Sequence, residues 1–159
     1  MVKKIVITLP AHVKKFFLFE YSGYVRKNGV DEIHVDKNSE LGKLLHLISR
    51  PIPYTQLTGK ATAAGSLSIR YYTHIQSFEV PIDKLPLLVH YMDEMFRRSL
   101  IYEVRGAQEL TGADYGPLIT SFLKRRGIEK DIDVDWQTLR KVYRDYVMKT
   151  NRKMAKSYA

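Results

Sequence analysis

The sequence predicts an α+β protein with a small mixed or antiparallel sheet in its N-terminal half and a helical C-terminal half that ends in a basic helix. Strand-like alternation of apolar and polar residues occurs only before residue 83, whereas apolar residues at helical spacing dominate after it. Segregation of the two element types favours α+β over a βαβ parallel sheet. The 159-residue chain has the size of one domain, with an α+β part (1–82) and a helical part (83–159).

The N-terminal half predicts short strands and two short helices. One helix is expected at 12–21. A second is expected after Ser39, which is a plausible capping residue; leucines at helical spacing follow it, and the prolines at 51 and 53 end this helix. Residues 77–82 are expected to pair with the last of the strands. The strands are predicted where β-branched or alternating residues occur, at 3–8, 32–36 and 67–72.

The stretch from Tyr54 to Ser66 has a different composition from its surroundings. It is rich in glycine, alanine and threonine, which are small or polar and have little apolar surface to bury. We therefore expect residues 54–66 to form a mobile arm that becomes ordered on a partner.

Three helices are expected in the C-terminal half. Asp83 is predicted to cap a long helix that runs toward Leu110 and stops at Gly112. A second helix is predicted to start at Pro117 and to end at Gly127. The last helix is expected from Trp136 to about Met154, capped by Asp133 or Asp135.

The charge of the chain is positive and unevenly distributed. Twenty-six lysines and arginines oppose 17 acidic residues, which gives a net charge of +9 and an isoelectric point near 9.6. Residues 121–159 hold 11 basic and 5 acidic residues and so carry most of this excess. Clustered cations in a basic protein are typical of polyanion binding.

The last predicted helix combines an apolar stripe, headed by Trp136, Leu139 and Tyr143, with cations on its other sides. Such a helix can pack on its domain and present cations to phosphates. With the preceding helix it resembles a helical DNA-binding unit in outline, although the connection 127–135 is longer than a tight helix-turn-helix allows. The predicted nucleic-acid-binding residues are Lys124, Arg125, Arg126, Arg140, Lys141, Arg144, Lys149, Arg152 and Lys153.

No motif predicts catalysis, a cofactor or a metal. The chain has no cysteine, its five histidines never fall at i, i+4 on one helix, and no glycine-rich phosphate loop occurs. Asp131, Asp133 and Asp135 alternate as in a calcium loop, but the glycine and glutamate of that motif are missing, so they are interpreted as helix-capping acids. His34 with Glu32 or Asp36 on one strand face would need further ligands to form a site.

The leading hypothesis is a non-enzymatic nucleic-acid-binding protein, with DNA favoured over RNA. The alternative is a structural or assembly protein, such as a component of a phage particle, whose 54–66 arm contacts a neighbouring subunit; an enzyme without local motifs is a further alternative. Eleven tyrosines fit base stacking or a protein interface, including a homo-oligomer. Because the apolar runs are too short to span a bilayer, we expect no membrane partner and a cytoplasmic location or one within an assembled particle.

Overall fold

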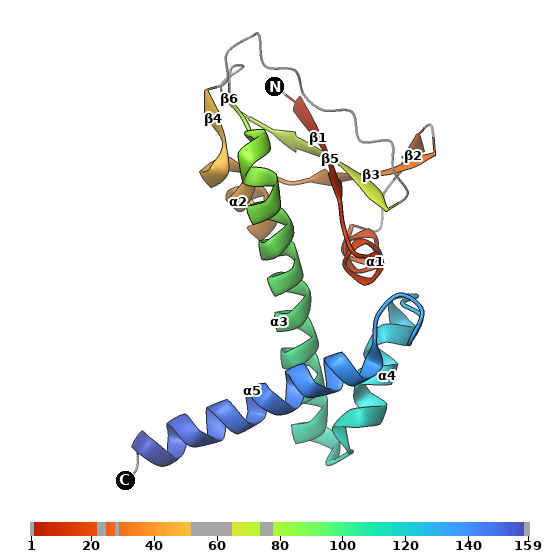
Figure 1. Cartoon of the computed structure of the whole chain (residues 1–159), viewed down its shortest axis with the longest axis vertical. Coiled ribbons are helices and arrows are strands. Elements are labelled where there is room, and N and C mark those ends of the chain that lie inside the picture. Colours follow the sequence, from red (N-terminus) through yellow and green to blue (C-terminus); the bar gives the residue numbers. More distant parts are fainter. Residues whose placement is uncertain (1, 22–24, 28, 52–64, 74–77, 158–159) are drawn as a thin grey trace. The chain divides into compact units, whose positions relative to one another are not determined.

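The computed structural model describes residues 2–21, 25–27, 29–51, 65–73 and 78–157 (Figure 1). The chain divides into two compact units, Met1–Asp93 and Glu94–Ala159, and the division falls inside the long helix α3 (Leu85–Thr111). The predicted boundary between the α+β and helical parts lay before this helix. The expectation of a single domain stays a prediction.

The first unit is built on a four-stranded sheet with the order β1-β5-β3-β2. The central strand β5 is antiparallel to β1 and parallel to β3, while β2 is antiparallel to β3. The sheet is therefore mixed, and the predicted α+β class is confirmed. Its strands are β1 (Val2–Thr8), β2 (Val25–Lys27), β3 (Val30–Val35) and β5 (Ser66–Tyr72).

One face of this sheet supplies the apolar core of the first unit. Ile69 of β5 lies between Ile5 of β1 and Ile33 of β3, and Ile33 and Ile69 are fully buried. Helix α1 (Ala11–Glu20) adds three buried side chains, and α2 (Glu40–Ile48) adds two leucines and contacts β5. The buried residues of the two helices are Val13, Phe16, Phe17, Leu41, Gly42 and Leu45.

A second sheet of two short strands corrects one prediction. Strand β6 (Phe78–Glu79) pairs with β4 (Arg50–Pro51), not with β5 as expected for residues 77–82. Two other interactions hold this segment to the main sheet: Lys3 pairs with Glu79 at 2.9 Å, and the amide of Val80 donates to the hydroxyl of Tyr71 at 3.4 Å. A strand of two residues is too short to show the alternation of apolar and polar residues that predicts strands, which explains why the sequence did not predict the pairing.

Helix α2 begins at a tight turn that requires a glycine. Ser39 caps it as predicted, because the Ser39 hydroxyl accepts a hydrogen bond from the Gly42 amide at 3.1 Å. A β-carbon at Gly42 would lie only 2.0 Å from the carbonyl oxygen of Asp36. The turn therefore presses directly against the first turn of α2.

The expected arm at 54–66 falls mainly outside the described residues, which omit 52–64. Its last two residues are described, and both are bonded to the chain at the end of β1. The carbonyl of Gly65 accepts a hydrogen bond from the Leu9 amide at 3.2 Å, and Ser66 pairs with Thr8 as the first residue of β5. The predicted boundary at Ser66 was wrong because backbone pairing with β1 extends the strand past its apolar residues.

The other face of the main sheet buries a carboxylate. Glu32 is 1% exposed, and its oxygens lie 2.9 Å from Nε of Arg70, 3.5 Å from Nζ of Lys4 and 3.7 Å from Nε2 of His34. Among the described residues neither oxygen has a hydrogen bond of acceptable geometry. Neighbouring positive charge therefore stabilises Glu32, and Arg70 is the closest source of it.

The helices that follow are α3, α4 (Tyr115–Arg125) and α5 (Trp136–Ser157), after a 3₁₀ turn η1 (Ile82–Lys84). Asp83 lies inside this turn, so the prediction that it caps α3 was wrong. Gly112 and Gly127, both at φ +67°, follow α3 and α4 at the predicted ends. Helix α4 begins at Tyr115, two residues before Pro117, and Asp114 is its N-cap. In the described part of the chain no helix is long and apolar enough to cross a membrane.

The close approach at Gly42 predicts opposite effects for two glycine substitutions. Gly42→Ala should destabilise the protein by about 1–3 kcal/mol, because its methyl group would collide with the Asp36 carbonyl. Gly106→Ala in α3 should stabilise it by about 0.5–1 kcal/mol, because nothing lies within 4 Å of that β-carbon and alanine favours the helix. Urea unfolding of both variants checks the pair. Equal effects at the two sites would contradict the geometry at Gly42.

The buried carboxylate predicts unequal contributions from its cations. Arg70→Met should cost about 2–3 kcal/mol, less than the ~3–5 kcal/mol for breaking a fully buried pair, because the Arg70 side chain is 37% exposed. Lys4→Met should cost less than about 1 kcal/mol, since Lys4 is half exposed and farther away. Adding Glu32→Gln to Arg70→Met should recover stability by removing the unpaired charge. Thermal unfolding measures all three variants, and a double variant less stable than Arg70→Met would contradict this account.

Candidate nucleic-acid interface

The second unit positions the predicted site residues on α4, α5 and the connection between them. Three buried side chains of α4 (Ile119, Phe122 and Leu123) anchor it, and the ring of Phe122 meets that of Phe96 edge-on, with centroids 6.0 Å apart. The side chain of Asp114 accepts a hydrogen bond from the Tyr115 amide at the start of the helix. The packed side of α4 is thus fixed, and its last turn carries the first predicted cations.

The cations at the end of α4 differ in how they are used. Arg126 is only 9% exposed; its Nη2 lies 2.9 Å from Glu103, and its guanidinium lies 3.9 Å from the centre of the Phe122 ring. Arg125 also pairs with Glu103 but is more than half exposed. Lys124 is exposed. Arg126 therefore stabilises the packing of α4 on α3, whereas Lys124 has no ion pair with another described residue.

A glycine-ended turn closes α4. The amide of Gly127 donates to the carbonyl of Lys124 at 3.1 Å, and the amide of Ile128 donates to that of Leu123 at 3.0 Å. This is the Schellman pattern, in which a residue of positive φ follows the helix and an apolar residue packs behind it. Ile128 is buried, as that pattern expects.

The acidic residues of the connection hold the start of α5. Asp131, at φ +63°, accepts a hydrogen bond from the Trp136 amide at 3.1 Å. Asp135 accepts one from the Gln137 amide and another from the Thr138 hydroxyl, whereas Asp133 bonds the Glu129 amide. Asp135 is thus the capping residue of the two that were predicted. Asp131 and Asp135 thus bond amides of the first turn of α5, as expected for acids at a helix start, whereas Asp133 fixes the connection itself.

Trp136 attaches the first turn of α5 to α4. Its ring lies 3.5 Å from the position that a β-carbon on Gly116 would take, so the missing side chain makes room for the indole. Nζ of Lys130 lies 4.3 Å from the centre of the ring and the guanidinium of Arg140 lies 5.6 Å from it. Arg140 therefore sits beside aromatic side chains, at the edge of the packed face.

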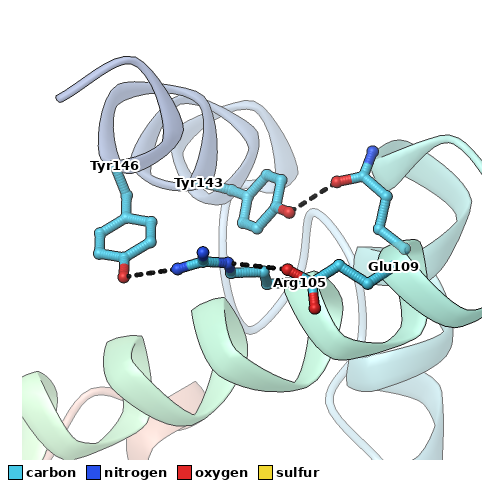
Figure 2. Close-up of polar contacts among 5 residues, drawn as sticks. Arg105, Glu109, Tyr143 and Tyr146 are labelled. Carbon is cyan, nitrogen blue, oxygen red and sulfur yellow. Dashed lines mark hydrogen bonds and ion pairs between the residues drawn. The ribbon is translucent and has the colours of Figure 1, made fainter. Parts of the chain in front are cut away.

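Farther along, tyrosines fix the rotation of α5. Tyr143 is 1% exposed, and its hydroxyl donates to Oε1 of Gln108 on α3 at 2.7 Å (Figure 2). Tyr146 accepts a hydrogen bond from Arg105, which also pairs with Glu109 of the same helix. Burial raises the pKa of Tyr143 above its ordinary value. The predicted apolar stripe thus faces α3 and α4.

The opposite side of α5 presents a row of cations, which we call the α5 stripe. At 100° per residue, its four members lie within an arc of about 80° nearly opposite Tyr143, along about 22 Å of helix. All four are exposed, and none has an ion pair or hydrogen bond with another described residue. The stripe also contains one acid, Asp145, which lies 3.9 Å from Arg144. Its cations are Lys141, Lys149, Arg152 and Lys156.

The structure thus divides the nine predicted residues into groups. Lys141, Lys149 and Arg152 belong to the stripe. Its fourth cation, Lys156, is not among the nine, because the helix was predicted to end near Met154 and instead continues to Ser157. The exposed flanking residues are Arg140, Arg144 and Lys153, and the residues on α4 are Lys124, Arg125 and Arg126.

Comparisons with models of known protein families, with curated proteins and with solved structures find no match to this chain.

The packing of Trp136 predicts a structural role for this side chain. Trp136→Ala should lower the free energy of unfolding by about 2–3 kcal/mol, somewhat less than for a fully buried aromatic residue, because the indole is partly exposed. Met148→Ala, on the exposed side of the same helix, should change it by less than about 0.5 kcal/mol. Chemical unfolding compares the two variants. A Trp136→Ala protein of unchanged stability and reduced nucleic-acid affinity would instead indicate base stacking.

Proposed function

We propose that this protein is a non-enzymatic nucleic-acid-binding protein that contacts backbone phosphates through the α5 stripe. The observation that carries the proposal is the stripe itself: four exposed cations on one face, none neutralised by another described residue. An ordinary solvated helix face mixes both signs of charge, whereas this one has a single acid. Cations in a row along a rigid helix suit a polyanion of regular spacing.

The end of α5 favours DNA as the partner. Residues 151–156 are all exposed, although Asn151 and Met154 line a shallow hollow with residues of α3. The major groove of B-DNA is about 12 Å wide and admits an α-helix, whereas the major groove of double-stranded RNA is too narrow. Arg152 would reach phosphates, or a guanine edge if the helix enters the groove.

The remaining cations would support this contact in different ways. Lys124 and Lys153 are exposed and would add to the attraction at longer range. Arg126 is paired with Glu103 and nearly buried, so we assign it no direct phosphate contact. The assembly alternative stays a prediction, because most of the 54–66 arm on which it depends lies outside the described residues.

The stripe predicts a strong, salt-dependent loss of binding when its charge is removed. The triple variant K141Q/K149Q/R152Q should bind a short DNA duplex more weakly than wild type. The slope of log K against log salt should fall by about 3, at roughly 0.9 per lost phosphate contact. Fluorescence anisotropy of a labelled duplex over a salt series measures both quantities.

A matched control separates the stripe from net charge. The variant R50Q/R97Q/R98Q loses the same charge from exposed residues outside α5 and should keep most of the wild-type slope. Circular dichroism should show that both variants are folded. The proposal fails if wild type does not bind the duplex, or if the two triple variants lose the same affinity and slope.

A further inference from the structure

A hollow of about 510 Å³ lies on the first unit, far along the chain from the α5 stripe. Its volume is within the ~300–1,000 Å³ range of small-molecule sites. It is lined by the turn between β3 and α2, by one side of α2 and by the last residue of β5. The side chains that carry its chemistry are Lys37, Asn38, Lys43, His46, Leu47 and Tyr72.

The fold holds the walls of this hollow in place. The turn is fixed by two short hydrogen bonds, from the Asn38 amide to the Asp36 carboxylate at 2.8 Å and from the Ser39 hydroxyl to the Asp36 carbonyl at 2.6 Å. The close approach of Asp36 to Gly42 fixes the same turn against α2. The hollow lies where the parallel strands β3 and β5 end, and carboxyl ends of parallel strands are common positions for ligand sites.

The lining combines an aromatic surface with positive charge. Tyr72 is 43% exposed, and Nζ of Lys37 lies 5.6 Å from the centre of its ring. Leu47 of α2 is 78% exposed, and Lys43 and His46 line the hollow from the same side of this helix. Among the described residues no carboxylate lines the hollow, and neither Lys37 nor Lys43 has an ion pair. An aromatic ring next to unpaired cations matches a flat base that carries a phosphate.

We propose that this hollow binds an unpaired nucleotide, with its base against Tyr72 and Leu47 and its phosphate near Lys37 and Lys43. Stacking on tyrosine is available to every base, and lysines supply the charge that a phosphate requires. The nucleotide can belong to a single strand or be free, since both have the same chemistry. The site lies in the first unit and is independent of the proposed α5 contact.

Photo-crosslinking with a site-specific readout tests this proposal. A short oligothymidine that carries one 5-iodouracil is irradiated with the full-length protein, and the crosslinked peptides are mapped by mass spectrometry. We expect crosslinks at Tyr72 or within residues 37–47. The α5 variant K141Q/K149Q/R152Q should keep them, so failure of the α5 proposal would leave this result unchanged. Crosslinks confined to other segments would overturn the site.

Binding of the same oligonucleotide to matched variants measures the contribution of each group. Tyr72→Leu, which keeps an apolar side chain, should weaken binding about tenfold, and Tyr72→Phe should retain it. K37Q/K43Q should weaken binding and lower its salt dependence, with an unchanged melting temperature as the sign that the fold is intact. Wild-type affinity in both Tyr72→Leu and K37Q/K43Q would overturn the proposal.

Competition identifies the source of the nucleotide. If adenosine monophosphate displaces the oligonucleotide at a concentration similar to that of an unlabelled single strand, the natural ligand is a free nucleotide. If only single strands displace it, the ligand is an unpaired segment of a nucleic acid. Either result supports the shared chemistry. A polyglutamate peptide could displace the labelled oligonucleotide as effectively as unlabelled oligonucleotide does. That result, together with unchanged binding in Tyr72→Leu, would show attraction by charge alone and contradict the proposal.

Discussion

The burial of Tyr143 is the constraint on which the candidate interface depends. Its ring is almost fully enclosed, it meets the ring of Tyr115 with centroids 5.2 Å apart, and its hydroxyl is hydrogen-bonded to Gln108. Because one buried residue fixes the rotation of a helix about its axis, the face of α5 opposite Tyr143 must point away from α3 and α4. The positions of Lys141 and Lys149 on the exposed side follow from this single packing contact.

The same structure shows that a positive net charge has several uses. Arg126 and Arg125 share Glu103, Arg70 compensates the buried Glu32, and Arg140 lies among aromatic rings. These cations stabilise packing. Exposed cations without an ion pair to a described residue occur in the α5 stripe and in the hollow beside Tyr72. Their arrangement, rather than the total of +9, is the physical basis of both proposals.

The sequence predicted those features that depend on neighbouring residues. The Ser39 cap, the ends of α3 and α4 at glycine, and the apolar stripe of α5 each have a local pattern. The pairing of β6 with β4 has no such pattern, because each strand has two residues. The position of Asp83 in a 3₁₀ turn depends on the backbone at Pro81, whose carbonyl accepts the Lys84 amide.

Features built from distant segments could not be predicted in this way. The pairing of Arg126 with Glu103 joins residues 23 positions apart on two helices, so its spacing gives no signal. The hollow unites Lys37, Lys43 and Tyr72 through the parallel pairing of β3 with β5, which sequence periodicity does not reveal. Periodicity therefore predicted on which side of α5 the cations lie, but not which cations the fold pairs with acidic residues.

Lysine footprinting tests the central claim most directly. The folded protein is acetylated briefly with and without a saturating DNA duplex, and the modification of each lysine is measured by mass spectrometry. The account predicts that DNA protects Lys141, Lys149 and Lys156 several-fold, while Lys4, exposed on the first unit, reacts equally in both samples. Unchanged reactivity of the three α5 lysines in a sample that binds the duplex would contradict it.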